Sequence, residues 1–359
     1  MKRILTNKGR IVKKLLLCVL VFLSIGACMA EAKPKIAILA TGGTIAGSID
    51  SAVATTGYTA GVVGVDVLIK AVPQIQDLAN ISGEQIANID SSNMRDEIWL
   101  KLAKEINKLF AEGVDGVVIT HGTDTMEETA YFLNLTIKSD KPVVLVGAMR
   151  PSTAISADGP KNLYNAVALA ADKESKGKGV MVAMNDKILS ARGVVKTHSL
   201  NVDAFSSPDF GDLGYIVDGK VFFYNNVAKA HTKNAPFDVS KLTSLPKVDI
   251  LYSYSNDGSG VAAKALFEHG TKGVVVAGSG AGSIHEDQKN VLKELMKKGL
   301  DVVVSSRVVA GHVAVSDSDK KLGFISAEDL NPQKARVLLM LALTKTSDPK
   351  KIQEYFLKY

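Results

Sequence analysis

The chain has 359 residues, of which 46% are hydrophobic and 22% charged, enough to form one large domain or two smaller ones with a sizeable core. It has no low-complexity tract, which excludes a disordered tail, a collagen and a coiled coil. The formal net charge of +6 would on its own suggest an acidic partner such as nucleic acid, so the positions of the basic residues matter.

The first 32 residues have the pattern of a secretory signal peptide. Six Lys and Arg residues precede the apolar run 15–25, and small residues then continue to Ala32. This run is too short to span a bilayer, so we expect a periplasmic product without a membrane span. Two cleavage sites remain open: Ala30-Glu31-Ala32 fits a soluble product, which we favour, and Cys28 fits a lipidated one.

Removing this segment changes both the charge and the cysteine count. Residues 1–32 contain six basic residues, one acidic residue and both cysteines, Cys18 and Cys28, so the remaining chain has a net charge of about +1 and no thiol. Disulfides, cysteine nucleophiles and thiolate metal sites are thereby excluded from it. No basic stripe is interleaved with aromatic residues, so no nucleic-acid partner is predicted.

Short β-branched runs alternate with segments of helical period from Lys35 onward, which is typical of an α/β fold with a mainly parallel sheet flanked by helices. The first half is predicted to contain strands at 35–40, 116–120, 142–147 and 179–184, and helices at 94–113, 125–138 and 161–174. A large N-terminal α/β domain over 33–230 follows from this pattern.

The Pro-punctuated stretch 231–247 is interpreted as a linker to a smaller C-terminal α/β domain over 248–359. This second part is predicted to contain strands at 248–254, 273–277 and 301–305, and helices at 261–270, 286–299 and 332–344.

Polar or Gly-rich turns follow the strands of the first domain, where open α/β sheets bind their ligands. ATGGTIAG at 40–47 has part of the spacing of a nucleotide loop, but Ser48 stands where that loop has its lysine, so phosphate binding is disfavoured. Thr44 then offers either a reactive hydroxyl beside backbone N–H groups or only a helix cap. Thr123 and Asp124 likewise fit a reactive pair or a cap, and we interpret His121 as structural.

Other catalytic classes lack their signals. The six histidines include no pair at i, i+4, which disfavours a zinc site, and no G-x-S-x-G elbow is present for a serine hydrolase of the α/β-hydrolase type. We therefore expect no metal and no cofactor.

Two long motifs give the chain a specific resemblance. ATGGTIAG at 40–47 and ITHGTDTMEETAYF at 119–132 resemble the two signatures of the bacterial secreted (type II) L-asparaginases. Stretches at 141–160, 236–242 and 330–346 agree as well, so the resemblance covers essentially the whole chain after the leader. It implies an amidohydrolase that acts by double displacement, with Thr44 as the nucleophile that forms an acyl-enzyme, and it implies a homotetramer.

The resemblance also assigns the partners of Thr44. It implies Tyr58, on a loop over 47–64 with the composition of a mobile lid, and a group formed by Thr123, Lys196 and Asp124. Physical reasoning agrees that Lys196, held near Thr123, could act as a base, while Asp124 offers a carboxylate to the substrate ammonium. Which threonine each partner activates is left open.

The remaining site residues are expected to bind substrate. Ser91 matches the residue that binds the α-carboxylate, with Ser92 beside it. The N–H groups of Gly43 and Thr123 are the expected oxyanion donors, and Ala148 is expected to accept from the leaving amide.

Three departures from the family pattern fall near the site. Ser92 replaces a usual glutamine, Ala281 and Ser283 replace asparagines, and the stretch 308–321 lacks a glutamate for which Asp317 or Asp319 could substitute. The second domain of this family completes a neighbouring subunit's site, so we expect L-asparagine hydrolysis with little glutaminase activity. The alternatives are a broader glutaminase-asparaginase and, in another class, a periplasmic solute-binding protein.

Overall fold

The structure is a computed structural model that describes residues 32–48, 51–53, 57 and 59–359. The predicted leader up to residue 31, with both cysteines, lies outside the described residues, and so does Tyr58. Within the described part, no helix combines the length and apolar character needed to cross a membrane. The two α/β domains predicted from the sequence are confirmed, while their boundaries stay a prediction.

The N-terminal domain is built on an eight-stranded sheet with the order β10-β9-β6-β5-β4-β3-β1-β2. Its strands are β1 (Lys35–Gly42), β2 (Asn80–Ile89), β3 (Gly116–Thr120), β4 (Val143–Val146), β5 (Val180–Met184), β6 (Lys187–Ser190), β9 (Gly214–Val217) and β10 (Lys220–Phe223). The strands from β2 to β5 pair in parallel, and β6, β9 and β10 continue the sheet in antiparallel pairs. The carboxyl ends of β1, β3 and β4 therefore lie side by side at one edge.

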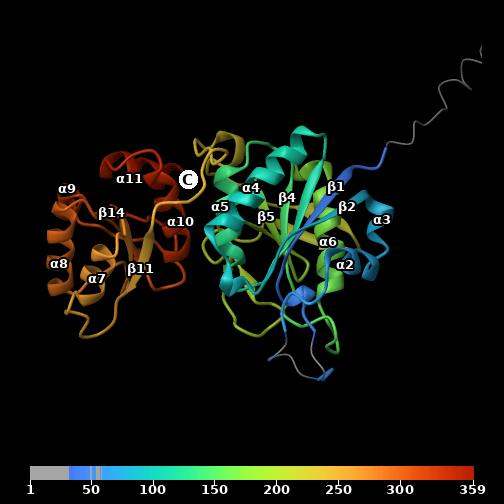
Figure 1. The fold of residues 1–359 in the computed structure, drawn as a ribbon, viewed down its shortest axis with the longest axis horizontal. Helices are drawn as coiled ribbons and strands as arrows, with labels where there is room; N and C mark the ends of the chain where they lie inside the picture. Colours follow the sequence, from blue (N-terminus) through green and yellow to red (C-terminus); the bar gives the residue numbers. More distant parts are fainter. Residues whose placement is uncertain (1–31, 49–50, 54–56, 58) are drawn as a thin grey trace, which may run out of the picture. The chain divides into compact units, whose positions relative to one another are not determined.

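Helices cover both faces of this sheet (Figure 1). The helices are α2 (Val65–Ala71), α3 (Ile75–Leu78), α4 (Asp96–Ala111), α5 (Met126–Thr136) and α6 (Gly159–Ala171). Side chains of α4 and α5 pack with Leu39 and Ile119 on one face, whereas α2, α3 and α6 pack with Ile38 and Val118 on the other. Successive residues of a strand point to opposite faces, so the apolar runs of β1 and β3 supply both layers.

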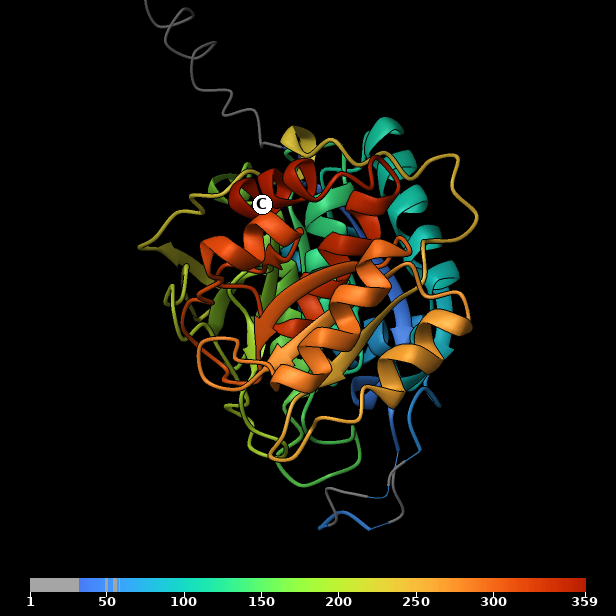
Figure 2. The same cartoon turned by 90° about the vertical axis from the view of Figure 1, so that its left-hand side faces the viewer.

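The C-terminal domain has a four-stranded parallel sheet with the order β11-β12-β13-β14. Its elements are β11 (Val248–Tyr252), α7 (Val261–Glu268), β12 (Gly273–Gly278), α8 (Glu286–Lys297), β13 (Asp301–Ser306), α9 (Asp317–Leu322), β14 (Ile325–Ser326), α10 (Pro332–Leu343) and α11 (Pro349–Lys358). Figure 2 shows α7 and α8, in orange, over one face of this sheet, where Leu292 packs with Val274 and Val302.

The other face of the C-terminal sheet shares its core with the first domain. Val275 and Val303 of the sheet, Leu338 of α10 and Tyr131 of α5 belong to one continuous hydrophobic cluster. The segment predicted as a linker also enters this cluster, because Phe237, Val239 and Leu245 are buried in it. Residues 231–247 are thus a packed connection, with one short helical turn, η4 (Thr232–Asn234).

Two further pieces of structure complete the described chain. A two-stranded antiparallel ribbon is formed by β7 (Val195–Lys196) and β8 (Phe205–Ser206), and short helical turns occur at η1 (Thr44–Ala46), η2 (Ser91–Asn93) and η3 (Lys173–Ser175). The ribbon carries Lys196, one of the residues that the sequence predicts for the site.

Candidate active site

The first candidate motif follows β1. Gly42 and Gly43 have φ values of 108° and 81°, which favour glycine, and they turn the chain so that Thr44 begins η1. A Cβ on Gly43 would lie 2.4 Å from the Cα of Gly122. The two sequence motifs are therefore in contact because residue 43 has no side chain, and Thr44 is buried next to that contact.

Lys196 joins the polar residues of the second motif. Its Nζ donates to Thr123 Oγ1 at 2.9 Å and forms an ion pair with Asp124 Oδ1 at 2.5 Å. The Lys196 side chain is 15% exposed and that of Asp124 is 62% exposed. The predicted group of Thr123, Asp124 and Lys196 is thus assembled from segments more than 70 residues apart, with its carboxylate open to solvent.

The alternative reading of Thr123 and Asp124 as a helix cap does not fit this geometry. Helix α5 begins at Met126, its N-cap residue is Thr125, and the Thr125 side chain makes no capping hydrogen bond. The Thr125 hydroxyl instead donates to the main-chain oxygen of Ser91 at 2.8 Å.

Ser91 contacts the main chain of the second motif. Its hydroxyl accepts from the N–H of Asp124 at 3.3 Å, and a Cβ on Gly122 would lie 2.6 Å from the same oxygen. Ser92, which was expected to bind substrate beside Ser91, is exposed, and its hydroxyl donates to Asp90 Oδ1 at 2.8 Å. The Ser92 side chain is thus partnered within its own turn.

The two expected oxyanion donors differ in their surroundings. The N–H of Gly43 already donates to the main-chain oxygen of Ile89 at 2.9 Å, because the end of β1 stays paired with the end of β2. Using Gly43 as an oxyanion donor would therefore require this bond to be shared. Ala148 is fully buried just after β4, in a turn where Asp158 accepts from the N–H groups of the next two residues.

A buried charged group behind Lys196 has no counterpart in the sequence-based prediction. Glu127 accepts from the N–H of Lys196 at 2.9 Å and from Asn331 Nδ2, also at 2.9 Å. Asn331 caps α10, and the ammonium of Lys334 in that helix donates to the main-chain oxygen of Val194. The main chain at β7 is therefore held at two points, at Lys196 by Glu127 of α5 and at Val194 by Lys334 in the first turn of α10.

Burial and neighbouring charges shape this group. Burial lowers the pKa of Lys334 to about 8, against an opposing effect of the Glu127 carboxylate. Glu127 and Lys334 are both almost fully buried, and the charge of the Glu127 carboxylate offsets part of the cost of burying the Lys334 ammonium. Their positions within ITHGTDTMEETAYF and LNPQKARVLL were visible in the sequence, but nothing in the spacing paired them.

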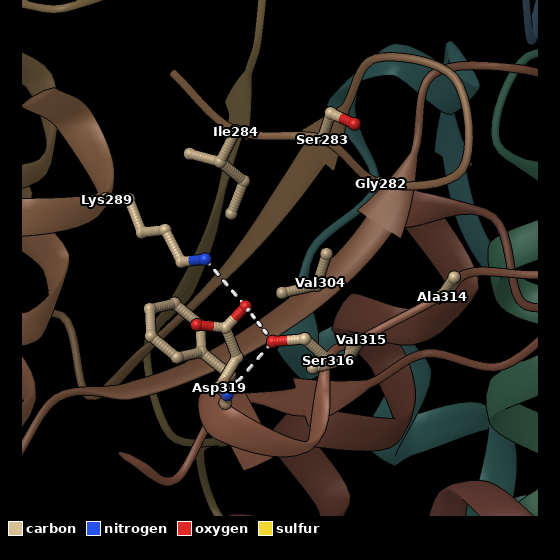
Figure 3. Close-up of a pocket in the computed structure, with 10 residues that line it drawn as sticks. Gly282, Ser283, Ile284, Lys289, Val304, Ala314, Val315, Ser316 and Asp319 are labelled. Carbon is tan, nitrogen blue, oxygen red and sulfur yellow. Dashed lines mark hydrogen bonds and ion pairs between the residues drawn. The ribbon is translucent and has the colours of Figure 1, made fainter. Parts of the chain in front are cut away.

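The C-terminal residues that depart from the family pattern lie in the turn after β12 and around α9. Ser279 and Ser283 bridge a tight turn after β12, so Ala281 lies at the tip of that turn. Asp319, one proposed substitute for the missing glutamate, pairs with Lys289 at 2.6 Å and accepts from Ser316 at 2.7 Å beside a pocket of about 240 Å³ (Figure 3). These partners hold Asp319 within its own domain, which leaves Asp317 as the freer of the two.

In the described residues, no group of three or more His, Cys, Asp or Glu side chains is arranged to hold a metal ion. The site contains two buried threonines, Thr44 and Thr123. The ammonium group of Lys196 contacts Thr123, and the carboxylate beside it is exposed. An ammonium near a hydroxyl stabilises the alkoxide that forms when the hydroxyl loses its proton, which suits nucleophilic attack on a carbonyl carbon.

Comparisons with known proteins identify the family of both domains. Residues 35–229 match the family "Asparaginase, N-terminal", and residues 247–356 match "Glutaminase/Asparaginase C-terminal domain". The chain is 56% identical to L-asparaginase 2 of Bacillus subtilis over 327 residues, 91% of this chain and 87% of the relative. It is 48% identical to a glutaminase-asparaginase of Pseudomonas fluorescens, over 92% of each chain.

A solved structure is also similar. The crystal structure of a probable cytoplasmic L-asparaginase from Campylobacter jejuni superposes with a TM-score of 0.90 at 90% identity, over 91% of this chain and all of the other. Matches of this length and identity, over both domains, leave no ambiguity about descent: this chain belongs to the asparaginase family.

Proposed function

We propose that this chain is an L-asparaginase, an amidohydrolase that converts L-asparagine and water to L-aspartate and ammonia. The observation that carries the proposal is the contact of Lys196 with Thr123 and Asp124, next to the turn that bears Thr44. Similarity to the L-asparaginase 2 of Bacillus subtilis supports the choice of substrate.

The reaction is proposed to run in two displacements. The Thr44 hydroxyl oxygen attacks the side-chain carboxamide carbon, the hydroxyl proton passes to the amide nitrogen, and ammonia leaves as the C–N bond breaks. A water molecule then attacks the resulting Thr44 ester, which releases L-aspartate and restores the hydroxyl. The N–H of Thr123 is the proposed donor to the oxyanion in both steps.

The surrounding side chains divide the remaining tasks. Lys196 donates to Thr123 in the described state, so it is proposed to stabilise negative charge that develops on this hydroxyl, and Asp124, at 2.5 Å, holds the ammonium group in place. The exposed part of Asp124 is proposed to bind the substrate ammonium, and Ser91 the α-carboxylate. Tyr58 is proposed to assist Thr44.

Little glutaminase activity is proposed as the consequence of the departures near the site. Ser92 is partnered with Asp90, and Ala281 and Ser283 offer no amide groups to a substrate. The alternative of a broad glutaminase-asparaginase is favoured by the Pseudomonas fluorescens relative. Comparable kcat/KM values for L-asparagine and L-glutamine would support that alternative and refute narrow specificity.

Three further expectations belong to this proposal. The leader-like segment 1–32 favours a periplasmic location, although the similar Campylobacter jejuni protein is described as probable cytoplasmic. The domain division at 33–230, 231–247 and 248–359 and the homotetramer, in which the second domain completes a neighbour's site, are likewise proposed.

The central test compares two threonines of the same motif. Thr44→Val removes the proposed nucleophile, and Thr41→Val removes a hydroxyl that only donates to the main-chain oxygen of Thr120 at 2.9 Å. Ammonia release from L-asparagine should fall on the order of 10⁴-fold in Thr44→Val and by less than about tenfold in Thr41→Val.

Two outcomes would contradict this proposal. Full activity of Thr44→Val would refute the assignment of the nucleophile. If the wild-type protein binds L-asparagine but releases no ammonia, the alternative of a solute-binding protein is correct.

A further inference from the structure

His121 is a buried residue of the second motif and takes part in an unbroken row of hydrogen bonds. Its Nδ1 lies 2.7 Å from the main-chain oxygen of Gly122, and its Nε2 lies 2.9 Å from the hydroxyl of Thr129. The same hydroxyl is 2.8 Å from Nε1 of Trp99. All three side chains are almost completely buried.

Burial disfavours the imidazolium, and a neutral imidazole satisfies this row in only one arrangement of protons. The indole of Trp99 can only donate, so it donates to the Thr129 oxygen, and the Thr129 hydroxyl then donates to His121 Nε2. A carbonyl oxygen can only accept, so His121 Nδ1 carries a proton and donates to Gly122. The imidazole is thereby a neutral Nδ1–H tautomer, in agreement with burial that lowers the pKa of His121 to about 4.

The bond to Gly122 has a consequence on the other side of the peptide plane. Carbonyl oxygen and N–H point in opposite directions across a trans peptide. A bond that holds the Gly122 oxygen towards the buried imidazole therefore holds the N–H of Thr123 away from it. That N–H is the oxyanion donor proposed above, whereas the other expected donor, at Gly43, is bonded to Ile89.

Glycine makes this peptide plane easy to rotate unless something holds it. Gly122 has no side chain, and a Cβ there would lie 2.6 Å from Ser91 Oγ, so Ser91 would have to shift to admit one. Its backbone thus lacks the restriction that a side chain imposes on φ and ψ. The hydrogen bond from His121 Nδ1 holds this carbonyl in its direction.

We propose that His121 is a positioning residue, which Trp99 and Thr129 fix in one tautomer so that it orients the Gly122–Thr123 peptide and aims the Thr123 N–H at the developing oxyanion. The inference rests on the proposed amide hydrolysis. His121 touches neither the substrate nor the nucleophile in this role and transfers no proton.

The test uses two replacements of His121 that differ in one donor. The side-chain amide of Asn places an N–H donor close to the position of Nδ1, so His121→Asn should keep the bond to Gly122. Leu has a similar size and no donor, so His121→Leu should lose it. Removal of an oxyanion donor costs about 10²–10³-fold in kcat, and loss of its orientation alone is expected to cost about tenfold.

The expected pattern is a decrease in kcat of about tenfold for His121→Leu with KM for L-asparagine within about twofold of wild type. His121→Asn should recover most of this loss, even if both variants are equally destabilised towards urea. Equal kcat for His121→Leu and wild type would overturn the inference, and so would equal losses in both variants.

A measurement on the wild-type protein tests the proton arrangement without relying on activity. ¹⁵N NMR of the imidazole should show a neutral Nδ1–H tautomer at pH 6, and Thr129→Val should weaken the preference for it. An Nε2–H tautomer in the wild type would refute the inference. Absence of ammonia release from wild-type protein with the expected NMR tautomer would instead refute the proposed function.

Discussion

The ion pair between Arg192 and Asp329 joins the loop after β6 to the segment before α10. Two parallel contacts of 2.6 Å connect the guanidinium to both carboxylate oxygens, and Arg192 Nε also donates to the main-chain oxygen of Tyr359 at 2.7 Å. The side chains are 5% and 19% exposed. Burial alone would raise the pKa of Asp329, but the hydrogen bonds and charge of Arg192 outweigh it, and the pKa is lowered.

Asp329→Asn keeps the shape of the side chain and removes its charge, so the buried guanidinium of Arg192 loses the carboxylate with which it pairs. Breaking one side of a buried pair costs about 3–5 kcal/mol, and we expect about 3 kcal/mol here because the amide oxygen still accepts one bond. For a chain of this length, this corresponds to a decrease in Tm of about 4 °C.

Asp140→Asn is the matched control. Asp140 pairs with Lys233 at 2.8 Å, but the two side chains are 32% and 54% exposed. An exposed pair contributes less than about 1 kcal/mol, so this variant should unfold within about 2 °C of wild type.

Urea unfolding at pH 7 and calorimetry provide the measurement. Because the folded-state pKa of Asp329 is lowered, its contribution is present above its unfolded pKa near 4 and is lost as the pH falls below it. The difference between wild type and Asp329→Asn should therefore shrink below pH 4. Equal losses for Asp329→Asn and Asp140→Asn would refute the reasoning that burial makes the first pair important.

Two more predictions concern Gly122 and His121 of the second motif. Gly122→Ala places a Cβ 2.6 Å from Ser91 Oγ, so it should displace Ser91 and raise KM for L-asparagine by about tenfold or more; an unchanged KM would contradict the role of Ser91. His121 has a folded pKa of about 4, below its unfolded value near 6.5, so the unfolded state takes up a proton first and wild type loses stability as the pH falls from 6.5 to 4. His121→Asn lacks this loss of about 3 kcal/mol. Urea titrations of both proteins at pH 7 and pH 4.5 should therefore show that their free energies of unfolding converge at the lower pH. Parallel pH profiles would contradict the buried neutral histidine.

The strands of the first domain that sequence reasoning predicted are those buried on both faces. β1, β3 and β5 are continuous apolar runs bounded by Gly, Pro or charged residues, so their pattern needed no knowledge of neighbours. β2 was missed because it is an edge strand whose residues are mostly exposed and polar, with Gly83 and Glu84 near its middle. The pair β7 and β8, two residues each, is set by long-range contacts and has no periodicity of its own.

Helix α11 had a signal that could have been used. Pro349 stands in its first turn, Asp348 caps it, and Ile352 and Phe356 recur at the i, i+4 spacing of a buried face. Its amphipathic pattern is as clear as that of α4, which the sequence did predict.

For the candidate site too, sequence reasoning found the local motifs and missed the long-range contacts. Thr44, Thr123 and Asp124 lie in compact local motifs that follow strands, so their sequence context indicated them. Glu127 and Asn331 are 204 residues apart, and Lys334 contacts Val194 across 140 residues. A single sequence carries no information on such pairings, because each of these residues also fits an ordinary exposed helix position.

The continuous core that α10 shares with α5 and both sheets bears on how this architecture can evolve. A second domain acquired by recombination would have to reproduce the apolar surface formed by Leu338, Val275 and Val303, and also the cap residue that reaches Glu127. The two domains are therefore not interchangeable modules. Substitutions on the shared surface of one domain restrict which substitutions the other domain can accept. We expect chimaeras exchanged at 231–247 to fold only when the α5 and α10 surfaces derive from the same parent.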